Sequence, residues 1–254
     1  MNSNSMQNIE VSRRYALLDS IRGITLLSMI LYHGTWDLVY LYGVNWDWYR
    51  GKGAYIWQQS ICWIFIFLSG FCWPLGKKHL KRGLIVFSSG MLVSVVTCLL
   101  MPENRVVFGV LTLIGSCMLL MIPLDKLLKK IPAKLGIFLS FLLFVLTRNI
   151  NKGYLGFESV NLSELPKAWY QGTVATYLGF TAPDFFSTDY FSLFPWFFLF
   201  VSGYFLHHIF VKSRVFSQPF FQWEPFLFSY MGRYSLLIYL LHQPVLYLAG
   251  LCIF

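Results

Sequence analysis

The sequence LLDSIRGITLLSMILYHGTWDLVYLY, residues 17–42, decides the fold. Apolar residues dominate a length sufficient to cross a hydrocarbon core of about 30 Å, so this stretch predicts a membrane-spanning helix. It also carries four ionisable residues, Asp19, Arg22, His33 and Asp37. An ionisable side chain in the middle of a spanning helix costs about 2.5–3.5 kcal/mol on insertion scales, and such residues usually line an interior path or site. The stretch therefore predicts a functional face as well as a helix.

The four ionisable residues share one face of this predicted helix. An α-helix turns about 100° per residue, so with Arg22 at zero, Asp19 and Asp37 both lie at about 60°. His33 follows at about 20° on the same scale. With a rise of about 1.5 Å per residue, His33 lies roughly 16 Å from Arg22 along the axis. We interpret the face as a polar stripe that points into the interior of a helix bundle.

Composition places the whole chain among membrane proteins. Of its 254 residues, 57% are hydrophobic and only 12% are charged, which is too little charge for a soluble domain of this length. The net charge of +9 does not indicate a nucleic-acid partner, because the Lys and Arg residues lie in short runs between apolar segments. Basic runs beside apolar segments are typical of membrane topology.

Six further apolar runs follow the first helix, and we expect an all-α, polytopic membrane bundle of about seven or more transmembrane helices. The fifth run is short, and could extend to Ile150 or begin near Ile131. We expect residues 1–16 to form a polar tail without a cleavable signal peptide, and residues 17–254 to form one transmembrane domain. The six runs are 54–75, 83–101, 105–123, 135–147, 190–211 and 229–254.

The distribution of positive charge predicts the orientation. With a cytoplasmic N-terminus, thirteen Lys and Arg residues fall in inner segments and six in outer ones. His33 then lies towards the outer leaflet and Arg22 near the cytosolic face. The outer loop 151–189 is long and mixed in character, and such loops are usually functional or partly structured. We expect a multi-pass protein of the cell membrane.

Two pairs on the first helix could carry chemistry. His33 and Asp37 are one turn apart, so the carboxylate could fix the imidazole tautomer and make a general base. A structural polar pair and a proton relay are the alternatives. Asp19 and Arg22 could form a simple ion pair, or Arg22 could bind an anionic ligand from the cytosol, since guanidinium is a preferred partner of phosphate.

The last run, GRYSLLIYLLHQPVLYL at residues 232–248, offers a second set. His242 lies deep in it at roughly the depth of His33, and Gln243 follows it. Arg233 lies near the inner end, but on a straight helix it faces about half a turn away from His242, so it could be only a basic flank. No His, Cys or carboxylate set has metal-ligand spacing, and we expect no metal.

Two aromatic helices share a small pair of residues at the same place. Residues 63–71 (WIFIFLSGF) are similar to residues 196–204 (WFFLFVSGY). Small residues let helices approach closely in membranes, so the Ser-Gly pairs indicate close packing without requiring an internal repeat.

Three segments resemble a known enzyme family. LLDSIRGITLLSMILYHGTWDL (17–38), DYFSLFPW (189–196) and GRYSLLIYLLHQPV (232–245) resemble the bacterial branch of the heparan-alpha-glucosaminide N-acetyltransferase catalytic-domain family. Arg22 and His33 also match the R-x10-H signature of the related acyltransferase-3 membrane enzymes. The lysosomal relatives have their catalytic histidine in the loop after the first helix, whereas this sequence has none between Gly34 and Lys78.

The resemblance implies a membrane acyltransferase that takes an acetyl group from cytosolic acetyl-CoA and delivers it to a sugar amine or hydroxyl on the far side. Arg22 would then hold a phosphate of coenzyme A, and His33 would act as general base, with a transient acetyl-histidine as the alternative. An oxyanion partner is also needed, for which His242 and Gln243 are candidates. The implied site comprises His33, Asp37 and His242 in catalysis, Arg22, Asp19, Arg233 and Gln243 at the donor, and Trp36, Asp189, Trp196 and Trp169 at the acceptor.

A protein of a different class remains open from the residues alone. A proton-coupled transporter or flippase could use His33, Asp37 and His242 to relay protons or to bind a solute. For the enzyme, the expected partners are a saccharide or glycolipid acceptor and the lipid bilayer, with a homo-oligomer possible.

Overall fold

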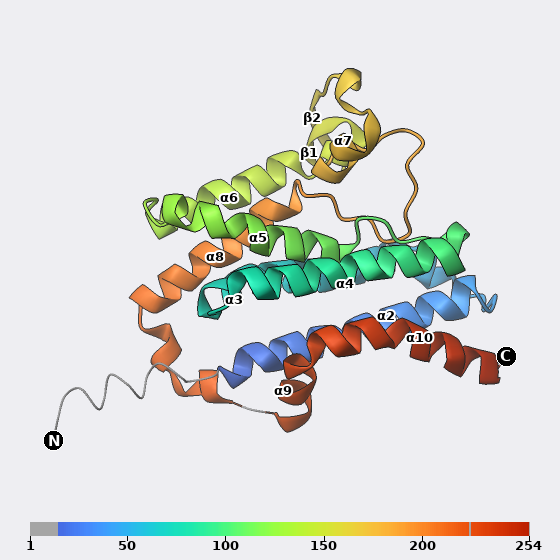
Figure 1. The fold of residues 1–254 in the computed structure, drawn as a ribbon, viewed down its shortest axis with the longest axis horizontal. Coiled ribbons are helices and arrows are strands. Elements are labelled where there is room, and N and C mark those ends of the chain that lie inside the picture. Colours follow the sequence, from blue (N-terminus) through green and yellow to red (C-terminus); the bar gives the residue numbers. More distant parts are fainter. Residues whose placement is uncertain (1–14, 224, 254) are drawn as a thin grey trace. The chain divides into compact units, whose positions relative to one another are not determined.

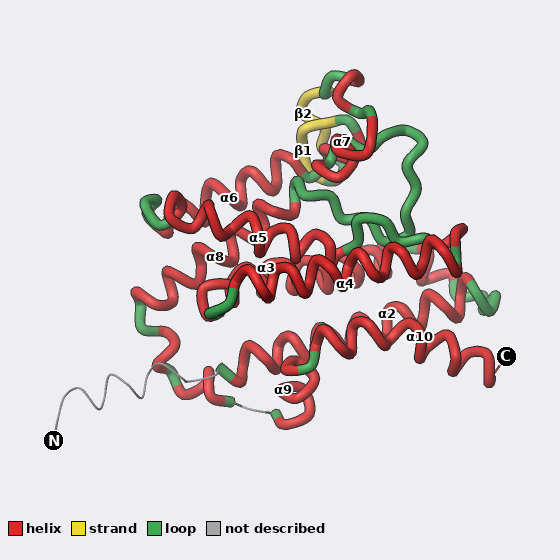
Figure 2. The backbone as a smooth tube through the Cα atoms, viewed as in Figure 1, coloured by secondary structure: helices red, strands yellow, loops and turns green. Residues whose placement is uncertain are grey.

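The computed structural model describes residues 15–223 and 225–253, and most of these are helical (Figures 1 and 2). The predicted polar tail lies, up to residue 14, outside the described residues. The chain forms two compact units, which we describe separately. The first unit joins residues up to 49 with residues from 214 onwards, and the second comprises residues 50–213.

The first unit is built on α2 (Ala16–Tyr40), which packs against α9 (Phe226–Arg233) and α10 (Ser235–Ile253). Two glycines let α2 and α9 touch along their backbones. A Cβ atom on Gly23 would overlap the carbonyl oxygen of Phe228, and a Cβ on Gly232 would overlap the carbonyl oxygen of Asp19. The two ends of the sequence therefore form one helical unit.

The predicted seventh helix is wrong in one respect, because it is two helices. α9 ends at Arg233, Tyr234 leaves helical geometry at φ −103° and ψ 22°, and α10 begins at Ser235. On one straight helix the directions of Arg233 and His242 would be fixed about half a turn apart. Because the helix is broken at Tyr234, α9 and α10 have different directions. Gly232 of α9 packs on α2, and α10 also packs along α2 (Figure 1).

The second unit pairs its helices as α4 on α5, α3 on α8 and α6 on α8. Gly70 of α3 and Gly203 of α8 meet at the crossing of those two helices. A Cβ on Gly70 would overlap the carbonyl oxygen of Phe200, and one on Gly203 would overlap that of Phe67. The two similar Ser-Gly pairs thus pack against each other, as close helix packing requires. The helices are α3 (Lys52–Cys72), α4 (His79–Leu100), α5 (Val110–Leu128), α6 (Ala133–Thr147) and α8 (Trp196–Lys212).

The predicted long loop is partly structured, as expected. We call residues 148–195 the loop lobe. It contains the antiparallel hairpin of β1 (Tyr154–Phe157) and β2 (Val160–Glu164), drawn in yellow in Figure 2, and the short helix α7 (Gly172–Leu178). The 3-10 turns η5 (Ile150–Lys152) and η6 (Lys167–Trp169) complete it.

Five helices among the described residues are long and apolar enough to cross a membrane. One of them, Ala133–Lys152, joins α6 to the 3-10 turn η5; the α-helix itself begins at Ala133, near the alternative start at Ile131, and ends at Thr147. α8 is a shorter apolar helix. α2 has 25 residues but is not among the five, so the membrane span expected at residues 17–42 stays a prediction. Seven spans and a cytoplasmic N-terminus stay predictions. The other four candidate spans are Lys52–Leu75, His79–Leu100, Val110–Leu128 and Ser235–Ile253.

Two predicted helix starts are corrected by the structure. α5 begins at Val110 instead of residue 105, because Arg105 and Val107 bond to the loop lobe: the Arg105 carbonyl accepts from the Thr188 amide at 3.1 Å, and the Val107 amide donates to Ser187 Oγ at 2.9 Å. α8 begins at Trp196 instead of residue 190, because Leu193 donates its amide to the carbonyl of Tyr177 at 2.8 Å. In both cases non-local hydrogen bonds replace the first helical turn.

Candidate active site

His33 of α2 and His242 of α10 lie together in the first unit. Their ring centroids are 5.0 Å apart with an interplanar angle of 59°. His242 is buried, and His33 is half-buried. The two histidines, expected at similar depth, are in ring contact although they lie 209 positions apart in the chain. Ionisable side chains inside a helix bundle are candidates for a functional site, and this pair is the one we describe further.

The backbone determines which nitrogen of His242 is free. Its Nδ1 lies against the carbonyl oxygen of Tyr239. A carbonyl oxygen can only accept a hydrogen bond, so Nδ1 carries the hydrogen and donates a hydrogen bond to it. The other ring nitrogen, Nε2, is then an unprotonated acceptor. It is buried and has no hydrogen-bond partner among the described residues. A neutral His242 is therefore arranged to accept a proton and not to donate a hydrogen bond to an oxyanion.

Asp37 is paired with Gln243, the residue that follows His242. Gln243 Nε2 donates to Asp37 Oδ1 at 2.7 Å, and Asp37 is only 2% exposed. Asp37 Oδ2 and Gln243 Oε1 are buried without a partner in the described part of the chain. Buried polar groups are nearly always hydrogen-bonded, so unpaired acceptors beside two histidines indicate a place for a ligand's donors.

The pair expected between His33 and Asp37 is not formed. Within residues 15–223 and 225–253, no hydrogen bond or ion pair joins these two side chains. The physical reason is that α10 brings the side-chain amide of Gln243 to Asp37. The carboxylate points towards this donor, 2.7 Å away, instead of along α2 towards His33. Asp37 thus positions α10, and with it His242, against α2.

Asp19 and Arg22 form the ion pair that the spacing allowed. Arg22 Nη1 lies 3.0 Å from Asp19 Oδ1, and the arginine side chain is 21% exposed. Gly232 packs on the carbonyl of Asp19, so the next residue, Arg233, belongs to the same end of the unit. Arg22 and the backbone of Arg233 therefore lie at one end of α2, and Arg22 is about 16 Å from His33 by helix rise. Arg22 keeps donors beyond Nη1 for a second anionic partner.

The residues predicted to contact the acceptor occupy different environments. Trp36 contacts Tyr40 in the first unit, with ring centroids 5.3 Å apart and ring planes tilted by 39°. Trp169 is 50% exposed in the loop lobe. Trp196 is 4% exposed, and the guanidinium of Arg148 lies 4.9 Å from its ring centroid. A ring buried in this way supports the core of the second unit, and an acceptor role for Trp196 stays a prediction.

Asp189, in the loop lobe, contacts the N-terminus of α5 through its side chain. Its Oδ2 accepts a hydrogen bond from the amide of Val110 at 3.5 Å, the position at which an anion is favoured by the helix N-terminus. Burial acts in the opposite sense and raises the pKa of Asp189 to about 6. The side chain therefore joins the loop lobe to α5, and its predicted contact with the acceptor stays untested.

Two residues that the sequence analysis did not single out organise the loop lobe. Arg148 Nη2 donates to Gln59 at 2.9 Å and lies 3.3 Å from a carboxylate oxygen of Glu158. Asn149 is 1% exposed, and its Nδ2 donates to the carbonyl of Glu158 at 3.0 Å. A polar cluster at the end of an apolar run was the only signal, and it resembled an ordinary helix end.

Among the described residues, no group of three or more His, Cys, Asp or Glu could hold a metal.

Comparison with known proteins identifies the family of the chain. Residues 14–244 match the family model described as heparan-alpha-glucosaminide N-acetyltransferase, catalytic. Searches of curated proteins and of solved structures returned no significant match. The match includes all of α2, the loop lobe and α10 as far as Pro244, and so contains both histidines. The chain therefore belongs to the heparan-alpha-glucosaminide N-acetyltransferase catalytic family, a family of membrane-embedded acetyltransferases that use acetyl-CoA as donor.

Proposed function

We propose that this protein is a multi-pass acetyltransferase of the cell membrane that moves an acetyl group from cytosolic acetyl-CoA to an amine or hydroxyl of a saccharide on the opposite side. The observation that carries the proposal is the contact between His33 and His242, with Nε2 of His242 left unpaired. Family membership supports acetyl transfer. The site residues supply the two further requirements, a place for the donor's phosphates and a proton acceptor.

The arginine end of α2 fits the donor. Acetyl-CoA carries phosphate groups, and guanidinium binds phosphate with planar, bidentate geometry. Arg22 is held by Asp19 at 3.0 Å, which pre-orients its side chain, and it remains 21% exposed. Arg233 lies at the same end of the unit and would add a second positive charge. The polar face of α2 then runs from this end to the histidines.

The histidine end fits the chemistry of acyl transfer. The donor supplies an acetyl thioester, and the acceptor nitrogen or oxygen forms a new bond to its carbonyl carbon. The proton that the acceptor loses passes to Nε2 of His242, whose lone pair is free. When the carbon–sulfur bond breaks, the same proton leaves with the sulfur as the thiol of coenzyme A. The ring centroid of His33 lies 5.0 Å from that of His242. His33 is therefore available to stabilise the charge that develops during transfer, or to accept the proton in place of His242.

Acetyl-CoA binding to the full chain in detergent tests the proposal, with Arg22→Ala as the variant. A hydrogen bond to a charged group contributes about 1.5–3 kcal/mol, so the dissociation constant should rise by roughly 10- to 150-fold. Arg50→Ala is the matched control, because Arg50 is exposed and belongs to the second unit. It removes the same charge from the protein and should leave the affinity unchanged.

Three outcomes separate the possibilities. Saturable binding that only Arg22→Ala weakens supports the donor site. Equal weakening by both variants would mean that net charge, and not the arginine end of α2, attracts the donor. Absence of binding to folded protein at millimolar acetyl-CoA would refute the proposal and would favour proton-coupled transport through the same polar face.

A further inference from the structure

The hairpin of the loop lobe exposes two large apolar side chains near its tip. Val160 is 57% exposed and Leu162 is 62% exposed, and both belong to β2. An antiparallel sheet with one face in water usually turns its apolar side chains towards the core and its polar side chains outward. The hairpin departs from this pattern, so we asked what covers the two side chains.

A bulge gives Leu162 its outward place. Asn161 of β2 pairs with Gly156 of β1, and Ser163 pairs with Leu155. Leu162, between them, has no partner on β1. A bulge of this kind re-aims a side chain and increases the local twist of the strand. The exposed leucine is therefore a product of the hairpin's own backbone geometry.

Hydrogen bonds fix the level at which the tip of the hairpin lies. The hydroxyl of Tyr55, in the first turn of α3, donates to Glu158 Oε2 at 2.7 Å, and Arg148 Nη2 lies 3.3 Å from Glu158 Oε1. Asn149 Nδ2 donates to the carbonyls of Glu158 and Val160 at 3.0 Å and 3.3 Å. The tip thus lies beside the first turn of α3 and the residues that follow α6.

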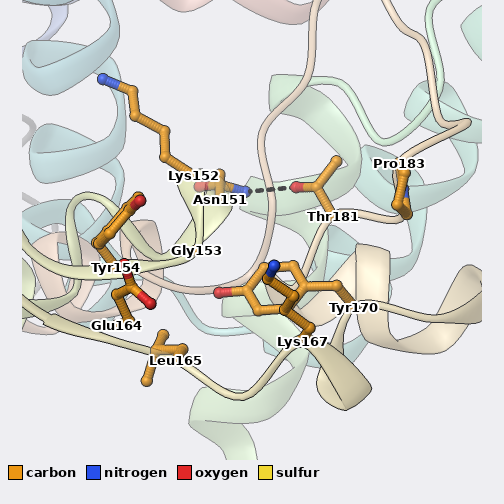
Figure 3. A pocket seen from close by; sticks show the side chains of 10 residues that line it. All are labelled: Asn151, Lys152, Gly153, Tyr154, Glu164, Leu165, Lys167, Tyr170, Thr181 and Pro183. Carbon is orange, nitrogen blue, oxygen red and sulfur yellow. Dashed lines mark hydrogen bonds between the residues drawn. The ribbon is translucent and has the colours of Figure 1, made fainter.

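The base of the hairpin is held at the same level. The amide of Leu165 donates to the carbonyl of Gly153 at 2.9 Å. Figure 3 shows this base, from which the side chain of Lys152 extends away. Because both the tip and the base bond to residues 148–153, the hairpin lies against this part of the chain and does not project from it.

The two supporting segments are candidate membrane spans, and their ends define a boundary. One is Lys52–Leu75 and the other is Ala133–Lys152. Tyr55 lies three residues inside the first span, which is about 5 Å from its end by helix rise, and Arg148 lies four residues inside the second. Segments that lie in a membrane surface bury their apolar side chains about 5–10 Å into the boundary between headgroups and acyl chains. The tip of the hairpin is level with that boundary.

We propose that the hairpin of β1 and β2 docks on the lipid bilayer, with Val160 and Leu162 inserted where headgroups meet acyl chains. This boundary suits both kinds of group on β2. Its apolar side chains would contact acyl chains, while the backbone groups on the unpaired edge of the two-stranded sheet would still reach headgroups and water. The loop lobe is then a membrane-bound part of the protein instead of a loop in water.

Fluorescence quenching in lipid nanodiscs tests this contact. The exposed cysteines Cys98 and Cys252 are replaced by serine, and bimane is attached through Leu162→Cys; the parent protein gives the labelling background. Dibrominated phosphatidylcholine quenches a fluorophore that touches acyl chains, whereas iodide quenches one in water. The control is Glu103→Cys, at an exposed residue of the turn η4 (Pro102–Asn104) beyond the end of the candidate span His79–Leu100.

We expect brominated lipid to quench bimane at position 162 about threefold more than at position 103, and iodide to show the reverse order. Val160→Cys provides a second labelled position and should behave like Leu162→Cys, so one misfolded variant would not decide the result. Quenching by iodide alone at positions 160 and 162 would place the hairpin in water and overturn the proposal. Protection from both quenchers would mean that protein covers the hairpin, from the first unit or from a second copy, and would overturn it as well.

Discussion

The contact between α2 and α9 predicts opposite effects for two identical substitutions on one helix. Gly23 and Gly34 both lie within α2, and alanine at either position gains about 0.5–1 kcal/mol of helix stability relative to glycine. At Gly34 the new methyl group would lie 3.4 Å from Leu246 Cδ2, which is ordinary contact. At Gly23 it would overlap the carbonyl oxygen of Phe228, a backbone atom that a side-chain rotation cannot move.

The expected difference follows from these two terms. Overpacking of a tight contact costs about 1–3 kcal/mol, so Gly23→Ala should be less stable than Gly34→Ala by about that amount. For a chain of this size, this corresponds to a gap of roughly 2–12 °C between the two unfolding midpoints. Thermal unfolding in detergent, followed by circular dichroism, measures the gap. If Gly23→Ala proved as stable as Gly34→Ala, the close contact between α2 and α9 would be refuted.

Two further predictions concern the site and the loop lobe. His242→Gln and His33→Gln should each lower the rate of acetyl transfer by about 10²–10⁴-fold, because they remove a proton acceptor or its neighbour, and neither should change the affinity for acetyl-CoA. If both variants transferred acetyl at nearly the wild-type rate, the histidine pair would not be the catalytic centre. Burial raises the pKa of Asp189 to about 6, above its ordinary value of 3.8, so the folded protein binds this proton more tightly than the unfolded chain. The free energy of unfolding should therefore fall as pH rises from about 4 to about 6, by something on the order of 1–3 kcal/mol, and level off above that. Asp189→Asn should remove this part of the slope in midpoints measured between pH 4 and 7, and an unchanged slope would contradict the assignment.

Local spacing made part of the site predictable. The helical period places Asp19, Arg22, His33 and Asp37 on one face, and it does so whatever the helix packs against. The Asp19–Arg22 ion pair followed directly from that period, and the structure shows it at 3.0 Å. The small Ser-Gly pairs likewise indicated close packing, because only small residues let two helix backbones touch.

Other predictions failed where a distant segment competed with a local one. Asp37 was expected beside His33, one turn away, yet it bonds to Gln243, which lies 206 positions further along the chain. The break at Tyr234 lies within the run 229–254, which the sequence analysis expected as one helix, and it shows only in how α9 and α10 each pack on α2. In the loop lobe, Arg148 and Asn149 resembled a helix end, and their bonds to the hairpin exist only after the chain has turned back.

The sequence by itself determined a helical membrane protein with a polar face on its first helix, because composition and the 3.6-residue period act locally and need no partner. Only the tertiary structure decided which side chains that face meets. Packing of Gly23 and Gly232 brings α9 onto α2, α10 then carries His242 to His33, and the Tyr239 carbonyl leaves Nε2 of His242 free. These are contacts between segments about 200 residues apart, and no local rule of spacing encodes them.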